Sequence, residues 1–296
     1  MNNSYIVLTE KELYLPLRES NTHKSNYGRI LIIGGSLGYS GAPCMSAKAA
    51  LRVGAGLVHL SVPKSIYAPV ASSQDEIMVR PYLDDVEGMF SGECISDLTN
   101  NLSLYDAILV GPGLGRSDAC IQLVKHIIEV FDGPLVIDAD GLFAVSVLGT
   151  DCIKGKNNLI LTPHIGEFLR LSNQSSVNDI SKQSAGFSRS LGVNVVLKSF
   201  ETAISFSDGS TYLSRYGNPG MATGGSGDVL AGMIVGFLGQ FSIRKAVINA
   251  VYIHGCAGNM AASELSEYSM LPTDIISCIP AIIKKYTPMR EGIENE

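Results

Sequence analysis

A glycine-rich segment of this chain ends in one acidic residue and leads directly into an apolar stretch. The segment, GNPGMATGGSGD, spans residues 217–228, and residues 229–238 are apolar enough to predict a helix. Backbone N–H groups at a helix start lack partners within the helix, and the helix dipole favours negative charge there. Gly225, Ser226 and Gly227 are therefore candidates for an anion hole that binds a phosphate group.

Asp228 stands directly beside this candidate anion hole, where a bound anion would repel its carboxylate. A general base that removes a proton from a hydroxyl attacking phosphorus would explain an acid at this position. An ordinary aspartate that caps the first helical turn is the alternative. The segment alone leaves both interpretations open.

Polar or glycine-rich groups follow five of the predicted strands. They are residues 34–41, 111–115, 138–140, 162–167 and 198–202. The carboxyl ends of parallel strands form the edge at which open α/β sheets bind ligands. Chance places polar residues after one or two strands, whereas five such groups indicate one shared site.

Two of these groups contain a single basic side chain in a setting that suggests ligand contact. Lys198 ends an apolar strand and needs an anionic partner, which is either a bound phosphate or the nearby Glu201. His164 follows a proline in a loop at a strand end, where functional residues concentrate. His59 and His254, in contrast, lie in apolar segments and are expected to be buried core residues.

Asp138 and Asp140 form a pair of acids after another strand. Because Mg²⁺ prefers oxygen ligands and keeps much of its hydration, the pair either contacts Mg²⁺ through water or caps the helix near Leu142. The chain contains no Walker A motif, zinc signature or nucleophile elbow. The residues themselves therefore indicate an α/β enzyme that handles a phosphorylated ligand, with Asp228 as its base.

The elements that position these groups are alternating strands and helices. Strands are predicted at residues 30–33, 57–62, 77–80, 107–110, 135–137, 158–161, 193–197, 202–206 and 211–213. Helices are predicted at residues 42–53, 119–131, 177–191, 229–238, 244–265 and 273–286. This alternation predicts an α/β fold with a mostly parallel sheet and right-handed crossovers, in one domain that spans residues 1–296.

The composition supports a folded protein and excludes several classes of partner. Of the 296 residues, 46% are hydrophobic and 17% are charged, and the net charge is −6 without any basic block, which argues against nucleic acid. The longest apolar helix is too short to span a membrane, and residues 1–20 lack the apolar run of a secretory signal. The six cysteines form no close pair and no metal-binding spacing, so we expect reduced thiols in a cytoplasmic protein.

The motifs as a set closely resemble those of the ADP/ATP-dependent NAD(P)H-hydrate dehydratases. The matching segments are RILIIGGSLGYSGA (residues 29–42), RVGAGL (52–57), VGPGLG (110–115), VIDADGL (136–142), TPHIGE (162–167) and NPGMATGGSGDVLAGM (218–233). The resemblance extends from about Lys24 to about Tyr286. It implies a ribokinase-like, three-layer α/β/α fold with a central, mostly parallel sheet.

The resemblance also implies an activity. Enzymes of this family return (6S)-hydrated NADH and NADPH, called NADHX and NADPHX, to NADH and NADPH as a form of metabolite repair. They phosphorylate the ring hydroxyl and then eliminate phosphate, which is a far better leaving group than hydroxide. ADP, which gives AMP and phosphate, is the expected donor with ATP as the alternative, and Mg²⁺ is the implied metal ion.

Two expectations about assembly follow from the same resemblance. Members of the family are often homotetramers, so this chain is expected to form one. Many bacterial relatives carry a fused epimerase domain, but the first strand here already begins at Ile30, which leaves no room for it. A separate NAD(P)HX epimerase is therefore the expected functional partner.

Matching positions imply which residues contact each substrate. Residues Ala42, Gly113, Gly115, His164 and Asp228 would contact the hydrated dinucleotide. Residues Lys198, Ser199, Phe200, Glu201, Thr202 and Gly227 would contact the adenine nucleotide. Asp228 would be the catalytic base beside the anion hole of residues 225–227.

Two positions depart from the family pattern. Ser199 stands where the family commonly has glycine after the lysine of the nucleotide-binding strand. Asn259 replaces the acid of a motif that usually reads HGxAGD and here begins at His254. The first departure puts a side chain where the backbone would approach the nucleotide.

Two other functions remain as alternatives. A ribokinase-like kinase of the thiazole or pyrimidine type would release a phosphorylated small molecule, although residues 218–222 favour the dehydratase. A non-catalytic nucleotide-binding protein with the same fold is the third reading. The presence of Asp228, His164 and Lys198 together argues against a protein that has lost its catalytic activity.

Overall fold

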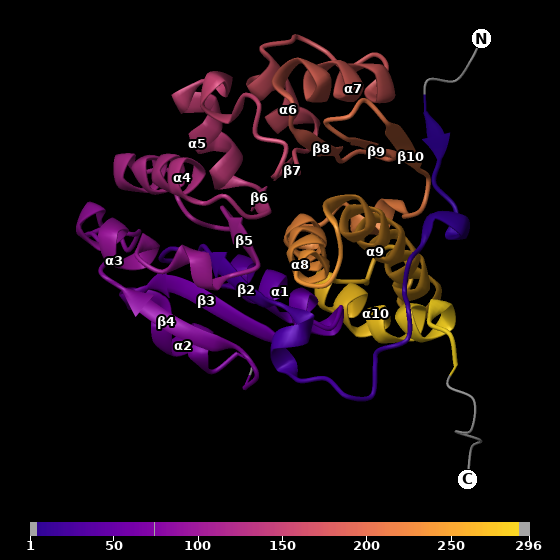
Figure 1. Ribbon diagram of the computed structural model, residues 1–296, viewed down its shortest axis with the longest axis horizontal. Helices are drawn as coiled ribbons and strands as arrows, with labels where there is room; N and C mark the ends of the chain where they lie inside the picture. The colour runs from indigo at the N-terminus through magenta and orange to yellow at the C-terminus, as the bar shows by residue number, and fades with distance from the viewer. Residues whose placement is uncertain (1–4, 74, 290–296) are drawn as a thin grey trace.

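The computed structural model describes residues 5–73 and 75–289, and Figure 1 labels its elements. One ten-stranded sheet runs through this described part. Its strands are β1 (Ile6–Val7), β2 (Arg29–Ile33), β3 (Leu57–Pro63), β4 (Met78–Tyr82), β5 (Ala107–Val110), β6 (Leu135–Ile137), β7 (Leu159–Leu161), β8 (Asn194–Leu197), β9 (Thr202–Ser205) and β10 (Thr211–Ser214). Their order across the sheet is β1-β10-β9-β8-β7-β6-β5-β2-β3-β4.

The sheet is mostly parallel, as the sequence predicted. Strand β9 runs antiparallel to its neighbours β8 and β10, and the other neighbouring pairs are parallel. The chain first adds β3 and β4 to one side of β2 and then returns to pair β5 with its other side. The ends of β2 and β5 therefore form a topological switch point, the place where open α/β sheets bind ligands.

Helices cover both faces of the sheet and give three layers (Figure 1). The α-helices are α1 (Gly41–Arg52), α2 (Tyr67–Ala71), α3 (Ile95–Thr99), α4 (Asp118–Val130), α5 (Asp140–Leu148), α6 (Ile165–Ser172), α7 (Ile180–Leu191), α8 (Ser226–Leu238), α9 (Ile243–Leu265) and α10 (Pro272–Tyr286). Helices α1, α8, α9 and α10 pack on one face around one buried core, and α3 to α7 pack on the other around a second. The predicted α/β class is thus confirmed.

Helix α8 lies at the centre of its layer and carries the glycine-rich segment at its start. Every residue from Val229 to Leu238 is buried, which explains why this helix is apolar all round. Its backbone lies directly against α1, because a Cβ at Gly232 would lie only 2.1 Å from the carbonyl oxygen of Ser46. This close packing places the start of α8, and with it Asp228, beside the start of α1.

Short 3₁₀ turns connect many of these elements. They are residues Glu10–Glu12, Lys24–Tyr27, Lys64–Ile66, Gly92–Cys94, Leu102–Leu104, Thr150–Ile153 and Pro219–Met221. The sequence did not predict the edge strand β1, which is two residues long and forms by pairing with β10. The sequence also did not predict helix α6. This helix begins inside the polar motif at residues 162–167, which lacks the periodic apolar residues that indicate a helix.

Two expectations from composition can be compared with the structure. Across residues 5–73 and 75–289, no helix combines the length and the apolar character needed to cross a bilayer. All six cysteines are free thiols, and four of them are buried. The prediction of reduced, mostly core cysteines is therefore confirmed.

Candidate active site

A cavity of about 820 Å³ lies at the carboxyl ends of β6, β7 and β8 and is closed by residues 216–228 and the start of α8. We call it the α8 cavity. Nine of the residues that the sequence assigned to the site line it: His164, Lys198, Ser199, Phe200, Thr202, Gly225, Ser226, Gly227 and Asp228. The structure therefore brings the expected nucleotide-contact residues, apart from Glu201, to one cavity together with the candidate base.

The start of α8 has the backbone that the glycine-rich segment predicted. Gly225 is the N-cap residue with φ at +106°, a left-handed conformation that strains any residue with a side chain. A Cβ at this position would also lie 2.6 Å from the side chain of Met45. The N–H of Ser226 donates to the carbonyl oxygen of Thr223 at 3.2 Å. Because glycine has no side chain to cap the helix, the N–H groups of Gly227 and Asp228 are left to an anion in the cavity.

Asp228 follows this turn and is half-buried. Burial, followed by repulsion from the Asp138 carboxylate, raises its pKa to about 7, although the Lys198 ammonium opposes the shift. A carboxylate with a pKa near neutrality is suited to general-base catalysis, because it is available at physiological pH and still takes up a proton. The alternative of a helix cap does not apply, because Asp228 lies inside the first turn and Gly225 is the N-cap.

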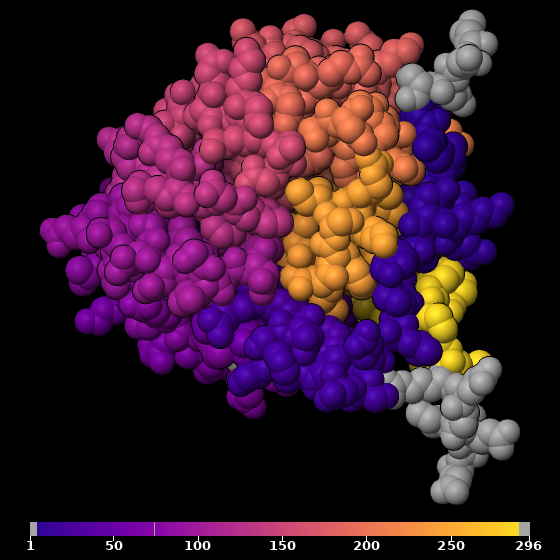
Figure 2. Space-filling view, viewed as in Figure 1, coloured from indigo at the N-terminus to yellow at the C-terminus, as the bar shows by residue number. Residues whose placement is uncertain are grey.

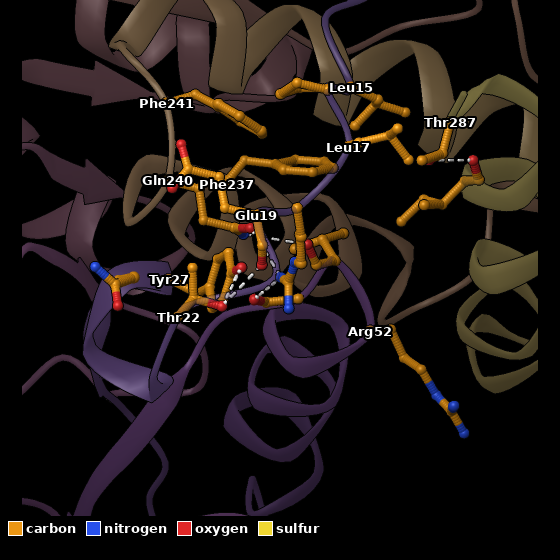
Figure 3. Close-up of a pocket in the computed structure, with 16 residues that line it drawn as sticks. Leu15, Leu17, Glu19, Thr22, Tyr27, Arg52, Phe237, Gln240, Phe241 and Thr287 are labelled. Atoms are coloured by element: carbon orange, nitrogen blue, oxygen red, sulfur yellow. Dashed lines mark hydrogen bonds between the residues drawn. The ribbon is translucent and has the colours of Figure 1, made fainter. Parts of the chain in front are cut away.

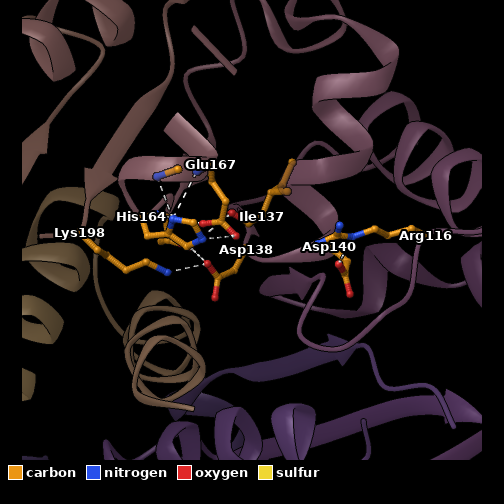
Figure 4. A network of polar contacts seen from close by, with 9 residues as sticks. Arg116, Ile137, Asp138, Asp140, His164, Glu167 and Lys198 are labelled. Carbon is orange, nitrogen blue, oxygen red and sulfur yellow. Dashed lines mark hydrogen bonds and ion pairs between the residues drawn. The ribbon is translucent and has the colours of Figure 1, made fainter. Parts of the chain in front are cut away.

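Lys198 makes an ion pair in the cavity, but with a different acid from the one considered in the sequence. Its Nζ lies 2.9 Å from Oδ1 of Asp138 (Figure 4). Burial opposes the charge on this lysine, and the carboxylates of Asp138 and Glu167 outweigh it and raise its pKa. Glu201 instead accepts a bond of 2.7 Å from Arg215, so the alternative of a local Lys198–Glu201 pair is wrong.

Both acids after β6, Asp138 and Asp140, form hydrogen bonds or ion pairs with other residues of the protein. Asp138 is 2% exposed and accepts bonds from Lys198 and from the hydroxyl of Thr162 at 2.7 Å. Asp140 accepts from Nε of Arg116 at 2.8 Å and from the backbone of Gly115 at 3.1 Å. Neither acid caps α5, whose N-cap is the residue between them, so the capping alternative is wrong.

His164 occupies the N-cap of α6 and points an exposed ring at the cavity. Its Nδ1 accepts a hydrogen bond of 3.0 Å from the backbone N–H of Gly166. A neutral imidazole that accepts at Nδ1 carries its proton on Nε2, and this Nε2 lies 3.5 Å from Oε1 of Glu167. Glu167 completes the cap by accepting from the backbone N–H of His164 at 2.9 Å, and burial raises the pKa of its carboxyl group.

Ala42, Gly113 and Gly115 do not line the α8 cavity. They lie at the switch point, where a Cβ at Gly113 would be 3.4 Å from the Cβ of Ala42. The hydroxyl of Ser46 bonds the carbonyl oxygens of both Ala42, at 3.3 Å, and Asp228, at 2.9 Å. Ser46 thus links the backbone of Asp228, which lines the cavity, to that of Ala42 at the switch point.

Several residues of the site were missed or undervalued by sequence reasoning. Thr162 carried no signal beyond its place after a strand, although it bonds Asp138. His254 is buried as predicted, at 8% exposure, but it also lines the cavity and contacts the start of α8. Asn259 accepts a bond of 3.2 Å from Asn218, so this departure from the family motif contacts the glycine-rich segment.

A second cavity, of about 530 Å³, lies at the opposite ends of α1 and α8 (Figure 3). Its floor includes the apolar side chains of Leu15, Phe237 and Phe241, and Arg52 stands at its edge. The N-terminal segment forms one wall, and Figure 2 shows this indigo segment running alongside the orange and yellow C-terminal helices. None of the predicted site residues lines this second cavity.

Comparison with known families identifies the relatives of this chain. A model of the family described as NAD(P)H-hydrate dehydratase matches residues 30–281. A bifunctional NAD(P)H-hydrate repair enzyme Nnr from Moorella thermoacetica is 37% identical over 95% of this chain. The chain covers 53% of that enzyme, and it spans about half the length of several relatives with the same name.

Relatives of similar length also exist. An ADP-dependent (S)-NAD(P)H-hydrate dehydratase from Enterococcus faecalis is 35% identical, and the alignment covers 94% of this chain and 92% of that enzyme. A solved ribokinase-like superfamily protein from the same species superposes with a TM-score of 0.82 at 33% identity, covering 97% of this chain and 98% of that one. The ADP/ATP-dependent NAD(P)H-hydrate dehydratase of Bacillus subtilis, co-crystallised with ATP and Mg²⁺, gives a TM-score of 0.80 at 28% identity, with 97% and 99% covered.

Proposed function

Because this chain belongs to the NAD(P)H-hydrate dehydratase family, we propose that it returns hydrated NADH or NADPH to NADH or NADPH with ADP as phosphoryl donor. The observation that carries the proposal is that Asp228 lines the α8 cavity while the Ser46 hydroxyl links its backbone carbonyl oxygen to that of Ala42 at the switch point. Burial and neighbouring acids hold the pKa of this carboxylate near 7. A base at that junction reaches a hydroxyl on one side and a phosphoryl group on the other.

Each part of the site is assigned one of the two substrates. We assign ADP to the α8 cavity, where Lys198 and the start of α8 supply positive charge and N–H donors for its phosphates. We assign the hydrated nicotinamide to the switch point beside Ala42 and Gly113, with the exposed ring of His164 on the cavity side. The exposed ring of Tyr39, whose carbonyl oxygen lies 2.8 Å from a Cβ built at Gly113, adds an aromatic surface there.

The first chemical step transfers a phosphoryl group. Asp228 takes the proton of the ring hydroxyl while the hydroxyl oxygen bonds the terminal phosphorus of ADP, and the bond from that phosphorus to AMP breaks. The N–H groups of Gly225 and Gly227 and the Lys198 ammonium stabilise the charge that develops on the phosphoryl oxygens. The products of this step are AMP and a phosphate ester of the hydrated ring.

The second step eliminates the phosphate. The ring nitrogen donates its electron pair as the carbon–oxygen bond breaks, and loss of a proton from the adjacent carbon restores the double bond. The water originally added to the ring leaves as part of inorganic phosphate. The overall reaction thus converts hydrated NAD(P)H and ADP to NAD(P)H, AMP and phosphate.

Mg²⁺ belongs to the proposal as a companion of the nucleotide. Within the described residues no group of three His, Cys, Asp or Glu side chains is arranged to hold a metal ion. Three carboxylates, those of Asp138, Glu167 and Asp228, nevertheless line the α8 cavity with the single ammonium of Lys198, which suits an additional cation. Glu167 would hold the ion through water, and the ion would neutralise the phosphate charges, in keeping with the preference of Mg²⁺ for water and phosphate oxygens.

The proposal extends to the surroundings of the enzyme. The six free thiols support a reducing compartment, and we place the reaction in the cytoplasm. The relatives named bifunctional repair enzymes support a functional pairing with an NAD(P)HX epimerase. A homotetramer is proposed from the family resemblance alone.

The direct test is absorbance of the reduced nicotinamide in a mixture of enzyme, hydrated NADH, Mg²⁺ and either ADP or ATP. We expect a nucleotide-dependent rise, faster with ADP, together with one AMP and one phosphate for each NADH formed. A flat trace with both nucleotides would contradict the proposal. A phosphorylated product from a thiazole or pyrimidine alcohol would then favour the kinase alternative.

A further inference from the structure

Asp138 is buried at the end of β6 and holds the lysine of the cavity. The lysine Nζ lies 2.9 Å from Oδ1 of this acid, and the Thr162 hydroxyl donates to the same oxygen at 2.7 Å. Figure 4 shows the Lys198 side chain extended toward Asp138. Asp138 is 2% exposed, and burial of a carboxyl group is costly unless such partners replace the hydrogen bonds that it loses with water.

The Lys198 ammonium also lies against the start of α8. Its Nζ is 3.0 Å from the position of a Cβ built on Gly227, one residue before the candidate base. The bond to Asp138 uses one of the three N–H donors of the ammonium. The remaining donors are therefore beside the anion hole, where the phosphoryl group of ADP would lie.

The lysine side chain is flexible, so its ammonium can form an ion pair with any acid within its reach. The charged groups that face Asp228 are Asp138 and Asp140 from the β6–α5 connection, Glu167 from α6, and Lys198 from the end of β8. An ammonium released from Asp138 would therefore find Asp228 as an alternative partner. That pairing would occupy the carboxylate oxygen that has to accept the proton of the substrate.

We propose that Asp138 is a positioning residue that keeps the Lys198 ammonium off the catalytic base and directs it at the transferred phosphoryl group. Thr162 fixes the Asp138 carboxylate in this arrangement. The inference rests on the proposed function, since it assigns a task within the same reaction. It also gives the first acid of the VIDADGL motif a role other than contact with Mg²⁺ or helix capping.

A double-mutant cycle tests the proposal. Asp138→Asn keeps the shape but removes the charge that holds the ammonium, so kcat should fall at least tenfold. The acid limb of the pH–rate profile should move to lower pH, because Asp228 loses a repelling neighbour and gains a cation. In a Lys198→Met background the same Asp138→Asn change should have less than a twofold further effect.

Thr162→Val is a second, milder variant. It keeps the proposal testable if the Asp138→Asn protein does not fold. It should lower kcat severalfold with the thermal unfolding midpoint within a few degrees of wild type, and its effect should also vanish in the Lys198→Met background. A buried residue with a merely structural role would lower the unfolding midpoint without moving the pH profile. The proposal would be overturned if the fold-losses in kcat of Asp138→Asn and Lys198→Met multiplied in the double variant. A folded Asp138→Asn protein with the wild-type kcat would also overturn it.

The affinity for ADP, measured by calorimetry without the hydrated dinucleotide, separates this inference from the proposed function. If wild type binds ADP but does not regenerate NADH, the proposed function fails. The same two substitutions still decide the role of Asp138 in that case. Non-additive losses of ADP affinity support the pair as a unit that positions the ammonium, and additive losses overturn it.

Discussion

His254 in α9 lies with Nε2 3.1 Å from the backbone carbonyl oxygen of Ser226 in the first turn of α8. A carbonyl oxygen can only accept, so the histidine donates, and its proton is on Nε2. Burial lowers the pKa of His254 to about 4, which keeps the ring neutral throughout the physiological range. A residue that the sequence suggested was core packing thus holds the turn that forms the anion hole.

Loss of this hydrogen bond should weaken nucleotide binding. A buried acceptor left without its donor costs about 1–3 kcal/mol, so His254→Ala should raise the KM for ADP about tenfold and lower the unfolding midpoint. His254→Gln, which can donate from its amide, should recover part of the affinity. The matched control is His59→Ala, because His59 on β3 packs edge-on against Tyr105 and does not line the cavity. An equal rise in KM for both alanine variants would contradict this role of His254.

Asp228→Asn removes the candidate base and keeps its shape. General-base catalysis typically contributes about 10²–10⁴-fold, so kcat should fall by at least that lower bound. Binding of ADP should be retained or slightly tightened, because the substitution removes a negative charge beside the phosphates. The measurement combines NADH regeneration with calorimetric titration of ADP. Turnover near the wild-type rate would show that another group takes the proton.

The same substitution should stabilise the fold at alkaline pH. The pKa of Asp228 is about 7 in the folded chain against an ordinary value of 3.8, so the folded state binds the extra proton. Stability is therefore lost as pH rises from about 4 to about 7, and this loss is absent in Asp228→Asn. The advantage of the variant in unfolding free energy should grow by about 2 kcal/mol between pH 5 and pH 8. A difference in unfolding free energy between the two proteins that stays constant from pH 5 to pH 8 would contradict the raised pKa.

The fold was largely predictable because its signals are local. Apolar runs such as Ile30–Ile33 and Ala107–Val110 are typical of strands buried on both faces, and each ends in glycines or polar residues. The strand order was not predictable from such runs, because it depends on which neighbours pair across the sheet. The two-residue strand β1 escaped prediction because its only signal is the pairing with β10.

The site was predictable in its residue types and less so in its pairings. The glycine-rich segment and Asp228 carry their own signal, since few other uses explain an acid at that position. The partner of Lys198 was missed because Asp138 lies sixty residues away, at the end of β6, and reaches the end of β8 only across the intervening strand β7. Sequence proximity favoured Glu201, which the structure pairs with Arg215 instead. Long-range ion pairs of this kind are fixed by topology rather than by any local pattern.

Gly225 should not tolerate a side chain. Gly225→Ala places a Cβ 2.6 Å from Met45 at a φ of +106°, and left-handed strain in a non-glycine residue costs about 1–3 kcal/mol. We expect a lower unfolding midpoint and at least a tenfold loss of ADP affinity. Gly224→Ala is the matched control, because a Cβ at Gly224 meets nothing within 4 Å. The assignment of the turn as the anion hole fails if both variants bind ADP as the wild type does.

Phe200 presents an aromatic ring at the α8 cavity with 89% of its surface exposed. A large apolar side chain this exposed contributes little to the fold, so its place beside the proposed ADP site suggests contact with the base. Base–aromatic stacking is worth about 1–3 kcal/mol, and Phe200→Ala should therefore raise the KM for ADP about tenfold without changing the unfolding midpoint. Tyr268→Ala is the control, because Tyr268 is equally exposed at 103% and does not line the cavity. A KM that does not move in Phe200→Ala would place the adenine elsewhere in the cavity, against Tyr216 or the glycine-rich segment.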